Sequence, residues 1–167
     1  SNYVKTFLKQ FRKKKILNKI LFFHGINEPT YQHLDLAVDE LRSKRNNEFD
    51  CLIAIGGGSA IDFAKGIATL LKNSGSGLKY RGFPKNLNPS IPLIAIPSTT
   101  GTGAELAYNA VFIDLKSKMK LGINSKNNKI NLLCDLGSGS IYNKENNFIP
   151  VEKEVQKYIS EGVDVVT

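Results

Sequence analysis

Short apolar blocks alternate with longer amphipathic stretches along the chain, and this alternation predicts strands and helices in turn. Residues 3–15 carry apolar side chains at intervals of three and four, the helical period, and end in lysines where the helix dipole favours them. Residues 16–23 predict a strand. A second helix is expected from Pro29 to about Arg45. Its apolar stripe consists of Leu34, Ala37, Val38 and Leu41.

The stretch from Cys51 to Ala68 combines a strand pattern, a glycine turn and a helix start. Residues 52–55 form a continuous apolar run, which is typical of a strand covered on both faces of a parallel sheet. Three glycines follow, and Ser59 is expected to cap the next helix. Residues 93–96 repeat the buried-strand pattern and lead into a loop rich in hydroxyls. These hydroxyls belong to Ser98, Thr99, Thr100 and Thr102.

Both turns have the chemistry of an anion site. A helix start offers unpaired N–H groups and the positive end of the helix dipole, while glycines let backbone approach a bulky anion closely. Several charge-assisted hydrogen bonds, about 1.5 to 3 kcal/mol each, would hold a pyrophosphate. In a parallel sheet both turns emerge at the carboxyl edge, where open α/β folds bind ligands. The alternatives are a tight strand-to-helix connection and a polar loop without a ligand, because residues 56–65 match neither the G-x-G-x-x-G nor the Walker pattern.

Composition indicates one ordinary globular domain. The 167 residues (18.5 kDa) are 41% hydrophobic and 23% charged, without an apolar run of membrane-spanning length or a secretory signal, so a cytoplasmic location is expected. Cys51 and Cys134 have no C-x-x-C partner and are interpreted as reduced, strand-buried thiols. The chain lacks an initiator Met and stops within an apolar run, which suggests a fragment.

The net charge of +8 raises the question of nucleic acid. Much of the excess lies in residues 12–15 and 116–129, without the interleaved aromatic side chains of a base-stacking surface. A solvated basic face is therefore expected, and neither a nucleic-acid nor a membrane partner. Such a rim can still attract a small molecule that carries phosphate.

Residues 3–126 resemble the iron-containing alcohol dehydrogenase family, in the broader group that includes dehydroquinate synthase and glycerol dehydrogenases. The family's Pro-Thr-Thr-Ala-Gly-Thr-Gly-Ser-Glu motif corresponds to residues 97–105, with three conservative departures, and residues 110–114 and 120–123 resemble the strands that follow. The first motif, three glycines, Ser, two residues, Asp, one residue, Ala and Lys, is matched by Gly56, Gly57, Gly58, Ser59, Asp62, Ala64 and Lys65.

The resemblance implies a nicotinamide dinucleotide, NAD or NADP. Its pyrophosphate would rest on Gly57, Gly58 and Ser59. The adenosine and ribose side would be contacted by Ser98, Thr99 and Thr102, with Val111 and Lys120 nearby. In the family, hydride passes between the nicotinamide and an alcohol or aldehyde substrate, while a divalent metal, iron or zinc, polarises the oxygen.

Two parts of the family pattern are expected to be missing. The metal is held by one Asp and three His, mostly in a second, helical domain, which we expect to be absent; His24 and His33 lie in the wrong region. The first strand, whose terminal Asp helps exclude the 2′-phosphate, is also missing, so the choice between NAD and NADP is unreadable. The chain alone is therefore expected to be inactive, and a homo-oligomer is compatible with the resemblance.

Residues 129–167 leave two interpretations open. One aligns residues 162–167 with the family's Gly-Met-Asp-Ala-Leu-Thr, which makes Asp164 the first metal ligand but leaves roughly ten extra residues before it. The other is a resemblance to bacterial L-seryl-tRNA selenium transferase, a pyridoxal-phosphate enzyme, in which Asp135 would pair with the pyridine nitrogen. Either way, a strand, a glycine turn and a helix over about 151–161 are expected.

The sequence thus predicts an α/β fold with a mainly parallel, Rossmann-like sheet. We expect a dinucleotide-binding domain over residues 1–126, incomplete at its amino end, and an appended βα segment over 127–167, with the junction near 126–129. The leading hypothesis is the nucleotide-binding part of an iron-dependent alcohol dehydrogenase. The alternatives are a non-catalytic phosphate- or nucleotide-binding fragment and a pyridoxal-phosphate-like tail.

Overall fold

A computed structural model describes residues 8–9, 11–14, 20–21, 23, 28–43, 49–99, 101–125, 132–134 and 165–166. The helices are α2 (Tyr31–Arg42), α3 (Gly58–Leu70) and the short 3₁₀ helix η1 (Gly77–Tyr80). The strands are β1 (Leu52–Gly56), β2 (Leu93–Pro97), β3 (Asn109–Asp114), β4 (Met119–Asn124), β5 (Leu132–Cys134) and β6 (Val165–Val166).

The central sheet is parallel, in the strand order β1-β2-β5-β6. Its first two strands pair in register from Leu52 opposite Leu93 to Gly56 opposite Pro97. The two strands therefore end side by side, and the segments that follow them leave the same edge of the sheet. The predicted α/β fold with a mainly parallel sheet is confirmed, with the addition of a separate antiparallel hairpin formed by β3 and β4.

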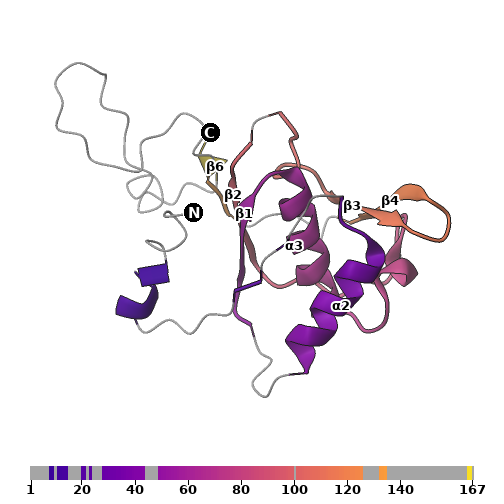
Figure 1. The fold of residues 1–167 in the computed structure, drawn as a ribbon, viewed down its shortest axis with the longest axis horizontal. Helices are drawn as coiled ribbons and strands as arrows, with labels where there is room; N and C mark the ends of the chain where they lie inside the picture. The colour runs from indigo at the N-terminus through magenta and orange to yellow at the C-terminus, as the bar shows by residue number, and fades with distance from the viewer. Residues whose placement is uncertain are drawn as a thin grey trace.

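Helix α3 lies between the sheet and α2, and it also contacts β3 of the hairpin (Figure 1). It is apolar almost all round: Ile61 and every residue from Phe63 to Leu70 are buried. A helix of this kind is stable only when it is covered on more than one side, which the sheet, α2 and the hairpin provide.

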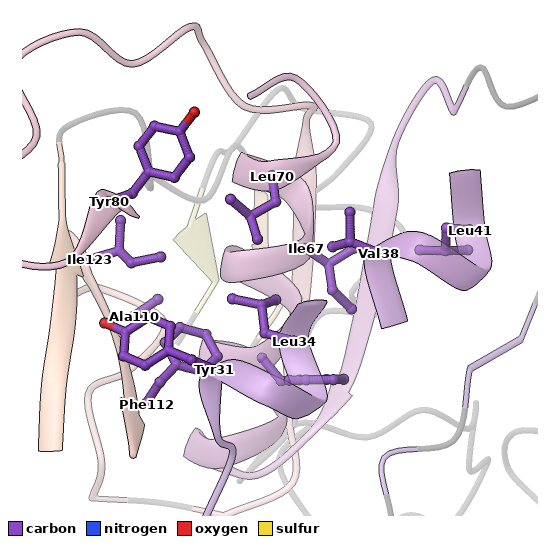
Figure 2. Packing of buried hydrophobic residues seen from close by; sticks show 11 residues of the cluster. Tyr31, Leu34, Val38, Leu41, Ile67, Leu70, Tyr80, Ala110, Phe112 and Ile123 are labelled. Atoms are coloured by element: carbon purple, nitrogen blue, oxygen red, sulfur yellow. The ribbon is translucent and has the colours of Figure 1, made fainter. Parts of the chain in front are cut away.

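Helix α2 begins where its sequence predicts, because the hydroxyl of Thr30 accepts a hydrogen bond from the His33 amide at 3.1 Å. It ends at Arg42, three residues before the expected end. Figure 2 shows its apolar stripe packed against α3 and the hairpin. Tyr31 extends this stripe: its ring lies 5.2 Å from that of Phe112, and its hydroxyl donates to the Leu121 carbonyl at 2.8 Å.

The amino-terminal predictions have mixed outcomes. The helix over residues 3–15 is confirmed where it is described, at residues 8–9 and 11–13. The strand over 16–23 is wrong for its described part, since Ile20, Leu21 and Phe23 belong to no strand. Leu21 and Phe23 are anchored by side chains instead: both pack on the large core, and Phe23 stacks on Phe63 at 4.7 Å between ring centroids. Apolar residues there meet a core rather than a neighbouring strand.

Two burial predictions for the first strand also change. Cys51 is a free thiol, but it is exposed, because pairing with β2 begins one residue later. Its expected burial is therefore wrong. Ile55, on the sheet face opposite α3, is 43% exposed, so the described residues do not fully cover that face. The expectation of a strand buried on both faces holds only for the side that α3 covers.

The carboxyl-terminal segment contributes two short strands to the same sheet, since β5 pairs with β2 and β6 pairs with β5. The expected helix over 151–161, the junction over 126–129, Asp135 and Asp164 lie outside the described residues. Strand β6 was not predicted. Within the described parts of the chain, no helix has the length and apolar character needed to cross a membrane.

Candidate functional site

The glycine turn after β1 leads directly into α3. Gly57, in extended conformation, is the residue before the first helical position, and its carbonyl accepts from the amides of Ala60 at 3.0 Å and Ile61 at 3.1 Å. Ser59 is the second residue of the helix, so its predicted capping role is wrong. Within the part of the chain that the structure describes, no side chain caps the helix. Among the described residues, the amides of Gly58 and Ser59 have no partner and remain available to an anion.

The glycine turn and the hydroxyl-rich loop touch each other. A Cβ at Gly57 would lie 2.9 Å from Thr99 Oγ1, and one at Gly58 would lie 3.0 Å from Thr102 Cβ. The two segments are also joined by backbone, because the Ser98 amide donates to the Gly56 carbonyl at 2.9 Å. The absence of side chains at the turn therefore lets two loops share one edge of the sheet, although Gly57 and Thr99 are 42 residues apart in sequence.

A cavity of about 310 Å³ opens beside this contact. It brings together six of the ten residues that the sequence singled out: Gly58, Ser59, Asp62, Thr102, Val111 and Lys120. Gly57 and Thr99 lie against each other at the turn, next to the cavity, while Gly56 and Ser98 are joined by the backbone hydrogen bond between β1 and the loop. The remaining lining residues are Glu28, Pro29, Ala104, Ala107 and Asn109.

Asp62 faces this cavity from the first turns of α3. Its Oδ2 accepts from the Val111 amide at 3.2 Å and thereby ties the helix to β3. Its Oδ1 is buried and has no partner among the described residues. Burial raises the pKa of this carboxyl, while the Val111 amide and Lys65 lower it and Glu28 raises it further. A buried acceptor without a partner is costly, so Oδ1 favours a ligand that brings a hydroxyl or amide donor.

Lys65, one turn further along α3, is 1% exposed. Its ammonium donates to three carbonyls of the segment that follows the hydroxyl-rich loop: those of Ala104, Ala107 at 2.6 Å and Asn109 at 3.0 Å. Burial lowers the pKa of this amine, and the carboxylates of Asp62 and Glu105 oppose that shift. All three N–H donors are thus satisfied, as a buried cation requires.

At the other wall, Lys120 of β4 forms an ion pair with Glu28 at 2.5 Å. The two side chains are 58% and 44% exposed, so the pair contributes little to stability. Lys120 nevertheless places a positive charge on the cavity lining. Its partner reduces that charge, and an anion in the cavity would compete for the same ammonium.

Sequence reasoning assigned no role to Lys65 and did not consider Glu28 or the alanines of the lining. The lysine had a signal, because it interrupts a run of apolar residues on a helix, and a buried lysine is rare without specific partners. Glu28 had none: it precedes the second helix and reaches Lys120 only because β4 folds back across 92 residues.

The described residues contain no group of three or more His, Cys, Asp or Glu side chains that could hold a metal ion. His33 is exposed on α2, and His24 lies outside the described part of the chain. We therefore assign no metal ligand among the described residues.

Known proteins resemble this chain in both sequence and fold. The family model for iron-containing alcohol dehydrogenase matches residues 1–133, slightly more than the expected 3–126. Sulfoacetaldehyde reductase of Bilophila wadsworthia is 38% identical over 99 residues, which are 59% of this chain and 25% of that protein. The solved structure of sulfoacetaldehyde reductase from Bifidobacterium kashiwanohense in complex with NAD+ superposes with a TM-score of 0.62 at 25% identity, covering 78% of this chain and 36% of that one.

The alignment with another relative includes part of the carboxyl-terminal segment. 1,3-Propanediol dehydrogenase of Citrobacter freundii is 28% identical over 153 residues, which are 89% of this chain and 39% of that protein. This alignment extends into residues 129–167, and the comparisons do not show the expected resemblance to selenium transferase. The chain spans about a quarter to two fifths of the length of these relatives. On the match over residues 1–133, the chain belongs to the iron-containing alcohol dehydrogenase family.

Proposed function

We propose that this chain is the dinucleotide-binding part of an iron-dependent, NAD(P)-linked oxidoreductase that interconverts an alcohol and an aldehyde. The observation that carries the proposal is the contact between two loops at one sheet edge. The uncapped start of α3 lies against the hydroxyl-rich loop, with the Cβ position of Gly57 only 2.9 Å from Thr99 Oγ1. Unpaired amides, short hydroxyls and no intervening side chains suit a pyrophosphate with its riboses.

The residues divide between the two halves of such a ligand. Gly57, Gly58 and Ser59 would hold the pyrophosphate through backbone amides, and the hydroxyls of the second loop would contact the adenosine and ribose side. That second group consists of Ser98, Thr99 and Thr102. In the cavity, Val111 would pack against the ligand, Lys120 would supply positive charge, and the free Oδ1 of Asp62 would accept a donor of the ligand.

The dinucleotide, when bound, supplies the hydride chemistry of the reaction. The task of this chain is then to bind and orient it: the turn approaches the phosphates, while the walls formed by α3 and β3 limit the positions that the reactive end can take. The NAD+ complex of the Bifidobacterium enzyme supports this proposal through the shared fold.

Fluorescence titration with NADH and NADPH tests the proposal directly. We expect saturable binding by the folded chain and at least a tenfold weaker affinity in Gly57→Val, because the new side chain would displace Thr99 from the shared edge. Gly122→Ala is a control for adding a side chain at a glycine away from the turn, since a Cβ there meets its nearest atom at 3.4 Å, an ordinary contact. A folded sample that binds neither nucleotide would refute the function. Equal affinity in Gly57→Val and wild type would refute the site.

We further propose that the chain by itself does not turn over alcohols, because a hydride acceptor must be combined with a group that polarises the substrate oxygen. Incubation of the isolated chain with NAD+ or NADP+, a short primary alcohol and added Fe²⁺ or Zn²⁺ should produce no more reduced nucleotide than the metal alone. Turnover above that control would contradict this second proposal and leave the binding site intact.

A further inference from the structure

Lys65 is a charged side chain of α3 that is almost completely buried. Its ammonium donates to the segment that follows the hydroxyl-rich loop. Its three acceptors, the carbonyls of residues 104, 107 and 109, span six residues of chain. The same three residues line the candidate cavity. Residues 104–109 thus form one wall of the cavity. The Lys65 ammonium, which does not itself line the cavity, binds the backbone of this wall.

The wall is also held at other points: Ala104 is buried in a cluster with Ala54 and Leu93, the Ser125 amide donates to the Tyr108 carbonyl at 3.0 Å, and strand β3 begins at Asn109. Residues 104–108 form neither a helix nor a strand, and the local backbone bonds are turn bonds in which Gly103 accepts from Leu106 and Ala107, each at 3.1 Å. A turn of this kind leaves its own carbonyls without ladder partners. The Lys65 ammonium satisfies three carbonyls of residues 104–109 at a single point.

Asp62 supports the adjoining residue in the same way. One turn before Lys65 on α3, its Oδ2 accepts from the amide of Val111, two residues beyond the last carbonyl that Lys65 holds. Two side chains of α3 thus bind the backbone of residues 104–111: Lys65 donates to its carbonyls, and Asp62 accepts from one of its amides. The opposite charges of the two side chains also stabilise each other, which makes the burial of each less costly.

We propose that Lys65 is a positioning residue: it fixes the 104–109 wall relative to the glycine turn and so sets the width of the dinucleotide cavity. The identity of the ligand in this inference rests on the proposed function. The role of Lys65 in placing the wall does not depend on that function. Because Lys65 reaches the wall from the same helix whose first turn forms the other side of the site, one rigid element defines both sides.

The test compares Lys65→Met with Thr69→Val, a change at another fully buried polar position one turn further along the same helix. Amide hydrogen exchange is measured by mass spectrometry for peptides covering residues 104–111 and for peptides covering α2. We expect exchange to accelerate at least tenfold in 104–111 of Lys65→Met, relative to α2, and the Kd for NADH to rise at least tenfold. Thr69→Val should leave the ratio of the two exchange rates and the Kd within twofold of wild type.

Uniform acceleration across both regions of Lys65→Met would show a purely structural lysine and overturn the proposal, as would an unchanged ratio. If Lys65→Met does not fold, Lys65→Arg decides in its place. Its planar guanidinium keeps the charge but cannot direct three donors onto the same carbonyls, so a local loss of protection at 104–111 is expected, and a uniform loss or none overturns the proposal. Wild type that fails to bind NADH would refute the proposed function, while the exchange ratio would still decide the role of Lys65.

Discussion

Helix α3 is packed against two clusters of different character. The first joins α3 to α2 and the hairpin through large side chains such as Leu34, Ile67, Leu70 and Phe112 (Figure 2). The second cluster joins α3 to strands β1 and β2 and consists mainly of small side chains. Its members are Ala54, Ile61, Ala64, Leu93, Ala95 and Ala104. Large side chains bury more apolar area, while small ones let backbones approach. The first cluster is thus suited to stability and the second to close placement of the site.

The two clusters are expected to serve two different properties, the free energy of unfolding and the affinity for the ligand. The glycine turn leads into the start of α3 and Lys65 lies near the middle of the helix, whereas Leu70 ends it, about 18 Å from Gly58 along the axis. A change in the large cluster should lower the free energy of unfolding and leave ligand affinity alone. A change at the turn should have the opposite pattern.

Leu70→Ala should have the largest effect on stability. Leu70 is fully buried in the large cluster, so truncation leaves a cavity and should lower the free energy of unfolding by about 2 to 5 kcal/mol. Urea denaturation measures the loss, and the folded variant should bind NADH with a Kd within twofold of wild type. Leu36→Ala, at a position 67% exposed on α2, is the control and should change stability by less than about 0.5 kcal/mol. A tenfold weaker Kd in folded Leu70→Ala would mean that the two clusters are not independent.

Gly58→Ala should show the reverse pattern. The added methyl lies 3.0 Å from the Thr102 side chain, so it should push the hydroxyl-rich loop from the turn and weaken NADH binding about tenfold, or about 1.4 kcal/mol. Stability should change by less than about 1 kcal/mol, because alanine is the better helix former at the first position of α3. Titration and urea denaturation of the same sample separate the two quantities. Unchanged affinity would show that the contact between the loops does not shape the site.

Tyr31→Phe should have the smallest effect, and one that depends on pH. The lost hydrogen bond to the Leu121 carbonyl should cost about 0.5 to 1.5 kcal/mol at neutral pH. Burial raises the pKa of Tyr31 from 10.0 to about 12, with Arg81 lowering it and Asp114 raising it. The folded state keeps the phenolic proton to higher pH than the unfolded chain, so this stabilisation is complete below pH 10 and is lost as the pH rises through about 12.

The difference in unfolding free energy between wild type and Tyr31→Phe should therefore shrink between pH 10 and 12. Taking the difference cancels the lysines that titrate in the same range. Chemical denaturation at several pH values from 7 to 12 measures it. Parallel curves for the two proteins would mean that Tyr31 titrates alike in the folded and unfolded states.

Local patterns were sufficient for the elements around the site. The apolar runs before the glycine turn and before the hydroxyl-rich loop became adjacent parallel strands, and the stripe of α2 became part of the large cluster. Patterns failed where pairing depends on a distant partner. Residues 20, 21 and 23 look like a strand but pack on a core, and Cys51 is exposed because β1 begins after it.

The cap of α3 was misjudged for a related reason. A serine after three glycines is a good capping residue, but the cap is decided by which carbonyl accepts the first helical amides, and Gly57 is in position to do so. The helix therefore starts earlier, and among the described residues neither a side-chain cap nor another partner occupies its first amides. The error concerned one residue, yet it bears on how an anion would be held.

The sequence by itself determined the parallel sheet and the two turns at one edge, because these follow from short-range periodicity and from the positions of glycines and hydroxyls. It also determined the family, through the resemblance of both turns to the family's motifs. Only the tertiary structure decided how the cavity is closed. Lys65, Asp62, Glu28 and Lys120 act through partners 39 to 92 residues away in sequence. Such contacts depend on how the helix, the hairpin and the loops pack, and no local pattern encodes the distance between them.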